Sequence, residues 1–378
     1  MNIVIAIDSF KGSLTSLEAG RAAAKGWRRA FPEANITIKP IADGGEGTVD
    51  ALVEGLGGSY RTVTAANPLG KPMEGRYGMV SDTVVIEIAA VAGLALLKEE
   101  DRNPMETTTY GVGELIKDAI ASGCRKFLIG IGGSATNDAG VGMLQALGFS
   151  FLDESGKSVP FGAKALGNIA SIETENVLPE LEECEFHIAC DVENPLYGEM
   201  GCSHIYARQK GASPEQILQM DSAIAHYAKI VAQAFPQADP NLPGSGAAGG
   251  LGFAFKTFLN ASLTSGIALV LDKIGIDECI KVADLVITGE GRIDSQTVMG
   301  KAPIGIAKMA KKYHKPVIAF AGSVSSDAAI CNQHGIDAIF SIVPSPCSLS
   351  QAMQRENALE NMENCAAQVA NVLAIKNK

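Results

Sequence analysis

The stretch of the chain that decides the fold covers residues 126–143 and reads KFLIGIGGSATNDAGVGM. Residues 127–131 form a short apolar run of the length that suits a buried strand. The glycine pair Gly132–Gly133 then predicts a sharp turn, and a helix is predicted to begin near Asp138. A strand, a glycine turn and a helix N-terminus in this order leave backbone N–H groups available to an anion.

Short polar side chains follow the glycine pair and could add hydrogen bonds at the mouth of this loop. They are Ser134, Thr136 and Asn137. The alternative is a tight strand-to-helix connection whose glycines only relieve backbone strain. This stretch alone supports both interpretations, and the rest of the chain has to decide between them.

Composition restricts the class of protein. The chain has 378 residues, of which 47% are hydrophobic and 19% charged, so two folded domains are expected. A net charge of −11 argues against general affinity for nucleic acid. No signal peptide is predicted, and no apolar run approaches the ~18 residues that a membrane span needs. The eight cysteines contain no C-x-x-C pair, which favours reduced thiols and a cytoplasmic enzyme.

Two early strands are predicted to end in polar residues. The run at residues 3–7 is followed by Asp8, Ser9 and Lys11, and the run at 36–41 by Asp43, Gly44, Gly45 and Glu46. Ligands of α/β proteins bind at the carboxyl ends of the strands, so these residues are candidates for binding substrate or metal. The alternatives are a capped loop in the first case and a helix cap at Asp43 in the second.

Two later strands end in the same way. The strand predicted at 185–190 leads to Asp191, with Pro195 predicting a helix start just behind it. The strand predicted at 283–288 leads to Glu290, Arg292 and Asp294. One arginine between two acids can be a mutual salt bridge, but acids at four strand ends together favour a shared functional site.

The order of the predicted elements indicates an α/β fold with two domains. Residues 1–62 and 284–378 are predicted to form a discontinuous, Rossmann-like domain with a doubly wound parallel sheet. The strands predicted from residue 59 onward form a meander, which marks residues 63–283 as a second, larger α/β domain with a mixed sheet. The ligand is expected in the cleft between the domains.

Two glycine patterns resemble dinucleotide-binding motifs. One is Gly130-x-Gly132-x-x-Ala135 after a strand, with Asp153 about 20 residues on, which leaves a NAD-dependent 2-hydroxy-acid dehydrogenase as an alternative. The other is Gly244-x-Gly246-x-x-Gly249, which no strand precedes and which close helix packing explains equally well. A third class, a non-catalytic carboxylate-binding protein, is disfavoured by the surplus of acids at strand ends.

The residues at the strand ends match the requirements of phosphoryl transfer. Carboxylates can hold Mg²⁺ and accept a hydroxyl proton, cations can neutralise the transferred charge, and glycine loops can offer N–H groups. Neither a Walker A motif nor the protein-kinase motifs occur in the chain. Further cations, Arg208 and Lys210, could contact phosphates or form a solvated basic turn.

Five motifs in order resemble those of the bacterial glycerate kinase family of type I. They are Asp8-Ser-Phe-Lys-Gly-Ser-Leu-Thr, Ala42-Asp-Gly-Gly-Glu-Gly-Thr, Gly130-Ile-Gly-Gly-Ser-Ala-Thr-Asn-Asp-Ala-Gly, Cys190-Asp-Val-Glu-Asn-Pro-Leu and Gly289-Glu-Gly-Arg-Ile-Asp-Ser-Gln-Thr. The resemblance covers nearly the whole chain and implies transfer of phosphate from ATP, with Mg²⁺, to D-glycerate. It implies the 2-hydroxyl as acceptor, with the 3-hydroxyl as the alternative. The segment around Cys202 and Arg208 departs from the expected pattern.

The resemblance also implies roles for the candidate residues. Catalytic roles are expected for Asp191, Lys11, Arg292 and Asp294, with Asp191 the first choice for the base and Asp294 its competitor. Substrate binding is expected of Asp8, Ser9, Asp43, Gly44 and Gly45, nucleotide binding of Gly132, Gly133, Ser134 and Asn137, and metal binding of Glu290 and Glu46. A homodimer is one option that the sequence leaves open.

Overall fold

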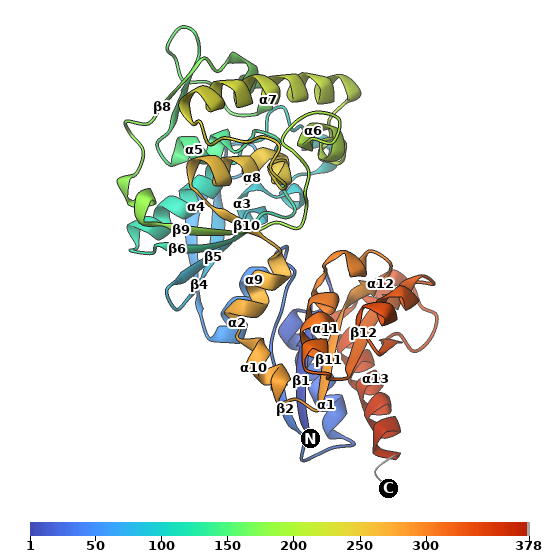
Figure 1. Ribbon diagram of the computed structural model, residues 1–378. Coiled ribbons are helices and arrows are strands. Elements are labelled where there is room, and N and C mark those ends of the chain that lie inside the picture. The colour runs from blue at the N-terminus through green and yellow to red at the C-terminus, as the bar shows by residue number, and fades with distance from the viewer. Residues whose placement is uncertain (376–378) are drawn as a thin grey trace. The chain divides into compact units, whose positions relative to one another are not determined.

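The computed structural model describes residues 1–375, so the last three residues of the predicted 284–378 segment lie outside it. The chain divides into two compact units (Figure 1). Unit 1 comprises residues 1–43, 50–58 and 267–378, and unit 2 comprises residues 44–49 and 59–266. The predicted α/β class, with a parallel-sheet domain interrupted by a mixed-sheet domain, is confirmed.

Unit 1 contains a five-stranded, entirely parallel sheet in the order β13-β12-β11-β1-β2. Its elements are β1 (Asn2–Ile7), α1 (Ser16–Arg28), β2 (Asn35–Ile38), most of α2 (Thr48–Leu56), α9 (Gly266–Lys273), α10 (Ile276–Lys281), β11 (Leu285–Ile293), α11 (Ala302–Lys312), β12 (Val317–Val324), β13 (Ala338–Ser341), α12 (Leu349–Ala352) and α13 (Arg355–Ile375). The sequence of residues 349–375 predicts one long helix, but the structure has two, α12 and α13, separated by a turn at Met353 and Gln354.

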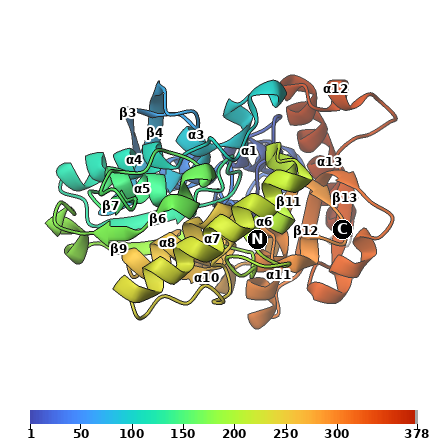
Figure 2. The same cartoon turned by 90° about the horizontal axis from the view of Figure 1, so that it is seen from above.

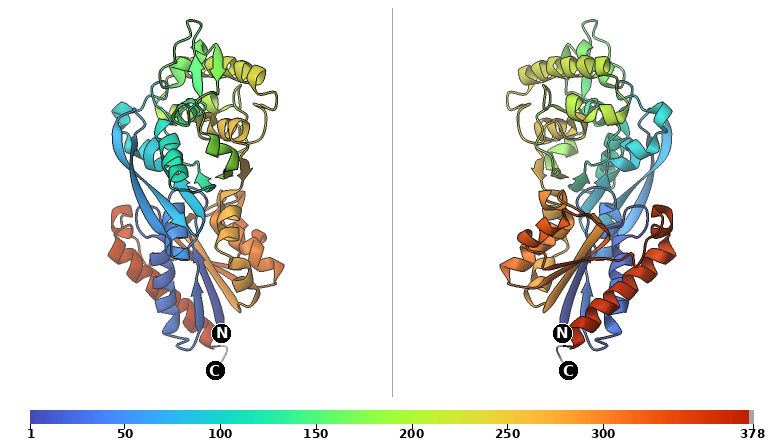
Figure 3. Two further views of the ribbon diagram at one scale, coloured as in Figure 1. Left: turned by 90° about the vertical axis from the view of Figure 1, so that its left-hand side faces the viewer. Right: turned by 90° about the vertical axis from the view of Figure 1, so that its right-hand side faces the viewer.

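Helices cover both faces of this sheet. Alternate strand residues such as Ile5, Ile287 and Phe320 pack with Trp27 of α1 and Met362 of α13 in one core. Figure 3 shows α1 in blue and α13 in red together on this face and α11 in orange on the other. The sequence pattern Thr15-x-x-Glu18 predicts a capping box at the start of α1, and the reciprocal hydrogen bonds between these two residues confirm it.

The domain boundaries of the structure differ from the predicted ones. Helices α9 and α10 belong to unit 1, although the prediction assigns residues 63–283 to the inserted domain. The reason is packing: Ile267 fills the space beside Gly305 of α11, and Lys39 Nζ donates to the carbonyl oxygen of Ile274 at 2.9 Å. The short segment 44–49, by contrast, belongs to unit 2.

Unit 2 contains a six-stranded mixed sheet in the order β10-β9-β6-β5-β4-β3 and a two-stranded sheet of β7 and β8. Its strands are β3 (Ser59–Ala66), β4 (Pro72–Val80), β5 (Thr83–Glu87), β6 (Lys126–Gly130), β7 (Ser150–Leu152), β8 (Ser171–Glu173), β9 (Glu185–Ala189) and β10 (Ser262–Thr264). Its helices are α3 (Ala89–Ala92), α4 (Tyr110–Ala121), α5 (Val141–Ala146), α6 (Cys202–Tyr206), α7 (Pro214–Ala234) and α8 (Ala247–Phe258).

The core of unit 2 is built from aromatic and aliphatic side chains on its helices and sheet. The long helix α7 packs beside α8, where the rings of Tyr227 and Phe253 meet edge to face at 6.2 Å (Figure 2). Within residues 1–375, no helix is long and apolar enough to cross a membrane.

Candidate active site

The acids Asp8 and Glu290 lie at the same edge of the parallel sheet of unit 1. Their strands β1 and β11 are neighbours in register, with Ile7 opposite Gly289. The N–H of Asp8 donates to the carbonyl oxygen of Gly289 at 2.9 Å, which extends the pairing by one residue. The sheet therefore brings together two acids that are more than 280 positions apart in the sequence, as the strand-end pattern predicts.

Asp8 is a buried carboxyl group in an unfavourable electrostatic environment. The residue is 3% exposed, and its carboxyl group accepts a hydrogen bond from the N–H of Ser9 at 2.6 Å. Burial, and then the charge of Asp43, raise the pKa of Asp8 to about 8, and Glu290 acts in the same direction. Asp8 therefore holds a proton at neutral pH unless a cation lies beside it.

Lys11 supplies positive charge near this carboxyl group. Its Nζ lies 3.9 Å from Asp43 Oδ2, and its side chain is about half exposed. The positive charge of Lys11 lowers the pKa of Asp8, although burial and Asp43 outweigh it. Lys11 thus lies close to Asp43, and its side chain is exposed enough to bind an anionic ligand.

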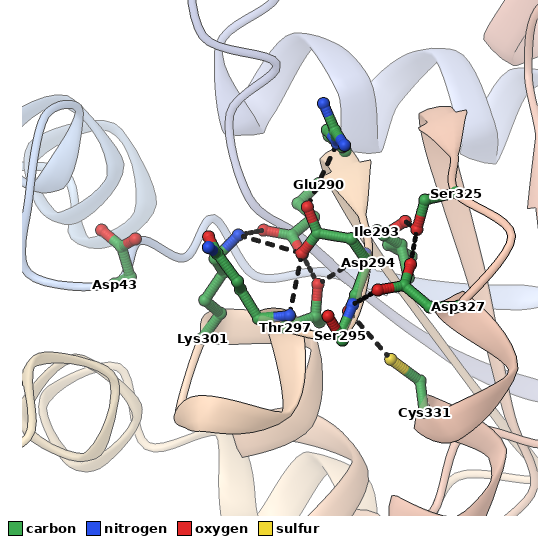
Figure 4. Close-up of polar contacts among 12 residues, drawn as sticks. Asp43, Glu290, Ile293, Asp294, Ser295, Thr297, Lys301, Ser325, Asp327 and Cys331 are labelled. Carbon is green, nitrogen blue, oxygen red and sulfur yellow. Dashed lines mark hydrogen bonds and ion pairs between the residues drawn. The ribbon is translucent and has the colours of Figure 1, made fainter.

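Glu290 and Asp294 are joined by a buried threonine (Figure 4). Thr297 Oγ1 donates to Glu290 Oε1 at 2.6 Å and accepts from the N–H of Asp294 at 3.2 Å. Lys301 Nζ lies 3.9 Å from Glu290 and 4.0 Å from Asp294, and Arg292 Nε lies 3.1 Å from Asp294. Burial raises the pKa of Glu290, whereas Thr297 and Lys301 oppose this shift. Neither Thr297 nor Lys301 is among the predicted site residues.

Residues after β12 form a second layer of contacts with the turn that contains Asp294 (Figure 4). Asp327 accepts from the N–H of Ser295 at 3.3 Å and from the hydroxyl of Ser325. Hydrogen bonds from the side chains of Ser295 and Ser325 lower the pKa of Asp327 to about 2. The thiol of Cys331 points to the carbonyl oxygen of Asp294 at 3.7 Å. Side chains from the loop after β12 therefore fix the turn after β11.

The acids of unit 1 fit a divalent cation only when a ligand shares its coordination. Within residues 1–375, no three His, Cys, Asp or Glu side chains are grouped closely enough to hold a metal ion by themselves. Mg²⁺ is normally held by one or two carboxylates together with substrate phosphates and waters. Asp8, Asp43 and Glu290 repel one another, and a bound cation would reduce this repulsion. Glu46, the other predicted ligand, is exposed and belongs to unit 2.

The glycine loop after β6 presents backbone N–H groups at the surface of unit 2. Gly132 and Gly133 are exposed, and their N–H groups have no hydrogen-bond partner among the described residues 1–375. The loop is tied on one side to the segment after α3, since Ala135 N–H donates to the carbonyl oxygen of Ala92 and Leu94 N–H to that of Gly133, both at 2.8 Å. Both predicted glycines are therefore free to bind an anion.

The helix N-terminus behind this loop does not contribute to an anion site. Helix α5 begins at Val141, three residues later than predicted, and has only six residues. The carboxylate of Asp138 is buried and accepts hydrogen bonds from the N–H groups of Thr109, Gly140 and Gly142 and from the Thr109 hydroxyl. Asp138 thus accepts hydrogen bonds from the N–H groups that are predicted to bind a ligand. Burial raises the pKa of Asp138.

Ser134 and Asn137 point into the protein, where other side chains engage them. Asn137 is fully buried, and its Nδ2 donates to Ser203 Oγ at 2.9 Å. Ser134 Oγ accepts from Lys210 Nζ at 2.8 Å. Lys210 itself is buried rather than solvated, and burial lowers its pKa to about 8. Only the glycines of the four predicted nucleotide-binding residues face solvent.

The segment with Gly44 and Gly45 lies against the same loop of unit 2. A side chain on Gly132 would meet Gly45 at 3.4 Å, and one on Gly44 would meet Ala189 at the end of β9 at 2.6 Å. The first turn of α2 is held here by Glu87 of β5, whose Oε1 accepts from a backbone N–H of that turn at 2.7 Å. Two predicted loops thus converge at the carboxyl ends of β6 and β9.

Asp191 follows β9 at this same edge. Its side chain is exposed, and its Oδ1 accepts from the N–H of Gly266 at 3.1 Å. The helix predicted to begin behind Asp191 is absent: within the described residues, the next helix starts at Cys202, because Pro195 lies in an irregular segment. The predicted base therefore accepts a backbone hydrogen bond and is exposed on the surface of unit 2.

The two dinucleotide-like patterns have structural explanations. Gly249 has a φ of +70° and packs so closely on the carbonyl oxygen of Thr136 that a side chain there would clash. Asp153 closes a tight turn by accepting from the N–H groups of Ser155 and Lys157 at 2.9 and 3.0 Å. Neither pattern forms the strand–helix unit of a dinucleotide site, so the dehydrogenase alternative loses its support.

Unit 1 has an all-parallel sheet with acids and cations at its strand ends, and unit 2 has a glycine loop with exposed N–H groups. These features are typical of an enzyme that acts on charged small molecules. The comparisons with known proteins specify which one. The chain belongs to the glycerate kinase family, whose model matches residues 3–374.

Relatives of known name match over nearly their full length. The glycerate 2-kinase of Escherichia coli K12 is 45% identical over 377 residues, which are 99% of this chain and 98% of the relative. The glycerate kinase of Bacillus subtilis 168 is 47% identical over 372 residues, 98% and 97% of the two chains. A crystal structure from Salmonella typhimurium LT2, of a protein assigned as glycerate kinase 2, superposes with a TM-score of 0.91 at 44% identity and covers 100% of this chain and 99% of its own.

Proposed function

We propose that the protein transfers the γ-phosphate of ATP to the 2-hydroxyl of D-glycerate, giving 2-phospho-D-glycerate and ADP. The observation that carries this proposal is the relationship to the glycerate 2-kinase of Escherichia coli, which extends over 99% of the chain at 45% identity. The pattern of acids, cations and exposed N–H groups supports it, because phosphoryl transfer needs all three.

The transfer step assigns a role to each group of residues. Asp191 accepts the proton of the glycerate hydroxyl, whose oxygen then bonds to the γ-phosphorus while the bond to the bridging oxygen of ADP breaks. The exposed N–H groups of Gly132 and Gly133 bind nucleotide phosphates. Lys11 and Arg292 neutralise the glycerate carboxylate and the transferred phosphoryl group. That all of these residues serve one pair of ligands remains a prediction of the sequence.

Mg²⁺ is the metal that this proposal implies. Glu290 and Asp43 would hold it together with phosphate oxygens, and when bound it would neutralise charge on the phosphates. Ser9 and Asp8 would contribute hydrogen bonds to the hydroxy acid on the same side of unit 1. Glu46 stays a predicted ligand without structural support.

The decisive measurement is ADP release in a coupled assay with and without D-glycerate, followed by phosphorus NMR of the product. The proposal expects glycerate-dependent ADP release and a phosphate on the carbon next to the carboxylate. A phosphate on the terminal carbon would establish the 3-hydroxyl alternative. A rate of ADP release that does not depend on D-glycerate would contradict the substrate assignment.

The assignment of the base needs a second experiment. Asp191→Asn should lower kcat by about 10²- to 10⁴-fold and leave the circular dichroism spectrum unchanged. Glu193→Gln is a matched control, since it removes an exposed acid two residues away. Turnover that survives Asp191→Asn but is lost in Asp294→Asn would transfer the role to Asp294.

A further inference from the structure

Lys210 is a buried cation for which the proposed transfer step has no role. It lies at the end of a 3₁₀ turn over Arg208–Lys210 and is 3% exposed, whereas Arg208 on the same turn is exposed. Lysine is almost never buried without partners that compensate its charge. What Lys210 contacts in the interior therefore indicates why it is there.

The ammonium group of Lys210 donates two hydrogen bonds to the glycine loop. Its Nζ donates to Ser134 Oγ at 2.8 Å and to the carbonyl oxygen of Thr136 at 2.6 Å. The ionisable groups that act on it are Asp138, in the same loop, and the thiol of Cys202 in α6. Hydrogen bonds to a charged donor are stronger than neutral ones, so these two bonds should dominate the local geometry.

The loop is restrained on both sides. Backbone hydrogen bonds involving Leu94 and Ala135 hold one side against the end of α3 and the segment after it. On the interior side, Thr107 Oγ1 donates to the carbonyl oxygen of Ala135 and Asn137 Nδ2 donates to Ser203 Oγ, both at 2.9 Å. Within residues 1–375, the buried side-chain oxygens Thr136 Oγ1 and Asn137 Oδ1 have no hydrogen-bond partner. Lys210 is the side chain that joins Ser134 Oγ to the carbonyl oxygen of Thr136 on the interior side.

We propose that Lys210 is a positioning residue for the nucleotide: by holding Ser134 and Thr136 from the interior, it sets the conformation in which the N–H groups of Gly132 and Gly133 face the phosphates. This inference rests on the proposed function and adds to it a residue that does not touch the ligand. A binding loop that is held from both sides needs no rearrangement when the phosphates arrive.

The test compares Lys210→Met with Arg208→Met in the full-length enzyme. Lys210→Met should raise KM for ATP about ten- to hundredfold, the loss expected for hydrogen bonds to a charged group, with kcat and KM for D-glycerate within about twofold. Arg208→Met removes an exposed cation from the same turn and should change none of these values. Hydrogen exchange should accelerate at the amides of Leu94 and Ala135 in Lys210→Met only.

A second variant covers the case in which Lys210→Met does not fold. Ser134→Ala removes one of the two partners and should raise KM for ATP by about two- to tenfold. Normal KM for ATP in Ser134→Ala together with normal KM or misfolding in Lys210→Met would overturn the proposal, as would an equal effect of Arg208→Met. If the wild-type enzyme does not phosphorylate glycerate, the proposed function fails, while the hydrogen-exchange comparison still tests the role of Lys210 in the loop.

Discussion

Replacing Asp8 with asparagine should stabilise unit 1 by an amount that grows with pH. In the folded protein, burial and the neighbouring charge of Asp43 raise the pKa of Asp8 from 3.8 to about 8. The folded state therefore keeps this proton over a range of pH in which the unfolded chain has released it. The contribution of Asp8 to the free energy of unfolding is therefore fully present below pH 3.8, and it is lost as the pH rises from there through about 8. Asparagine has the same shape and no proton to lose.

The size of the effect follows from one proton and the two pKa values. Between the two pKa values, wild-type unit 1 loses about 1.4 kcal/mol of unfolding free energy per pH unit relative to Asp8→Asn. From pH 5 to pH 7 the difference should grow by about 2.5 kcal/mol, and above pH 8 it should stay constant.

The chain offers a specific reporter for this measurement. Its single tryptophan, Trp27, is fully buried in the core of unit 1, so its fluorescence during urea unfolding follows the unit that contains Asp8. Unfolding curves at pH 5, 6, 7, 8 and 9 give the difference directly, and a signal from unit 1 alone avoids treating a two-unit chain as one transition. Asp272→Asn, which changes an exposed acid of α9, is the matched control.

A difference between Asp8→Asn and wild type that does not change with pH would refute the reasoning. It would mean that Asp8 is ionised in the folded protein at all these pH values, so that a cation or water compensates its charge. Infrared difference spectra can separate the two cases, because a protonated carboxyl band at pH 7 should be present in the wild type and missing in Asp8→Asn. Added Mg²⁺ should reduce that band if the acids bind the metal.

Three further predictions concern one side chain of the site and the packing of unit 2. Thr297→Val should move the acidic limb of the pH–rate profile to higher pH, because the hydrogen bond that lowers the pKa of Glu290 is lost, and Thr297→Ser should restore it. Gly249→Ala should destabilise unit 2 by more than about 3 kcal/mol through its clash with a backbone carbonyl, measured by thermal unfolding; Gly123→Ala, also at positive φ but with open space around it, should cost only about 1 kcal/mol. Glu87→Ala should cost about 1 kcal/mol by exposing the first turn of α2, and an unchanged midpoint would contradict that capping role.

Individual strands and helix starts could be predicted from the sequence, because short local patterns specify them. The apolar run of β1 and the Thr15–Glu18 capping box are local signals, and both are present in the structure. Acids directly after predicted strands also placed Asp8 and Glu290 at one edge, because parallel strands put their carboxyl ends together. Local periodicity could not show that α9 and α10 pack with unit 1.

The contacts that the sequence does not predict share a physical cause. Lys210 and Ser134 are 76 positions apart, and nothing in a lysine near a glycine tells whether its ammonium group faces solvent or the interior. Asp138 lies where a ligand-binding helix start is predicted, but its carboxylate binds the same N–H groups that a ligand would use. Partners of buried polar groups depend on tertiary contacts, so sequence patterns alone do not identify them.

The order of segments along the chain has a consequence for synthesis on the ribosome. Unit 2 is complete at residue 266, whereas the sheet of unit 1 has β1 between β2 and β11 and needs residues beyond 284. Domains fold as units while the chain grows, so unit 2 can fold first. Until β11 emerges, one edge of the apolar strand β1 has no partner and can pair with other nascent chains. A ribosome that stalls between these two points would therefore release an aggregation-prone protein.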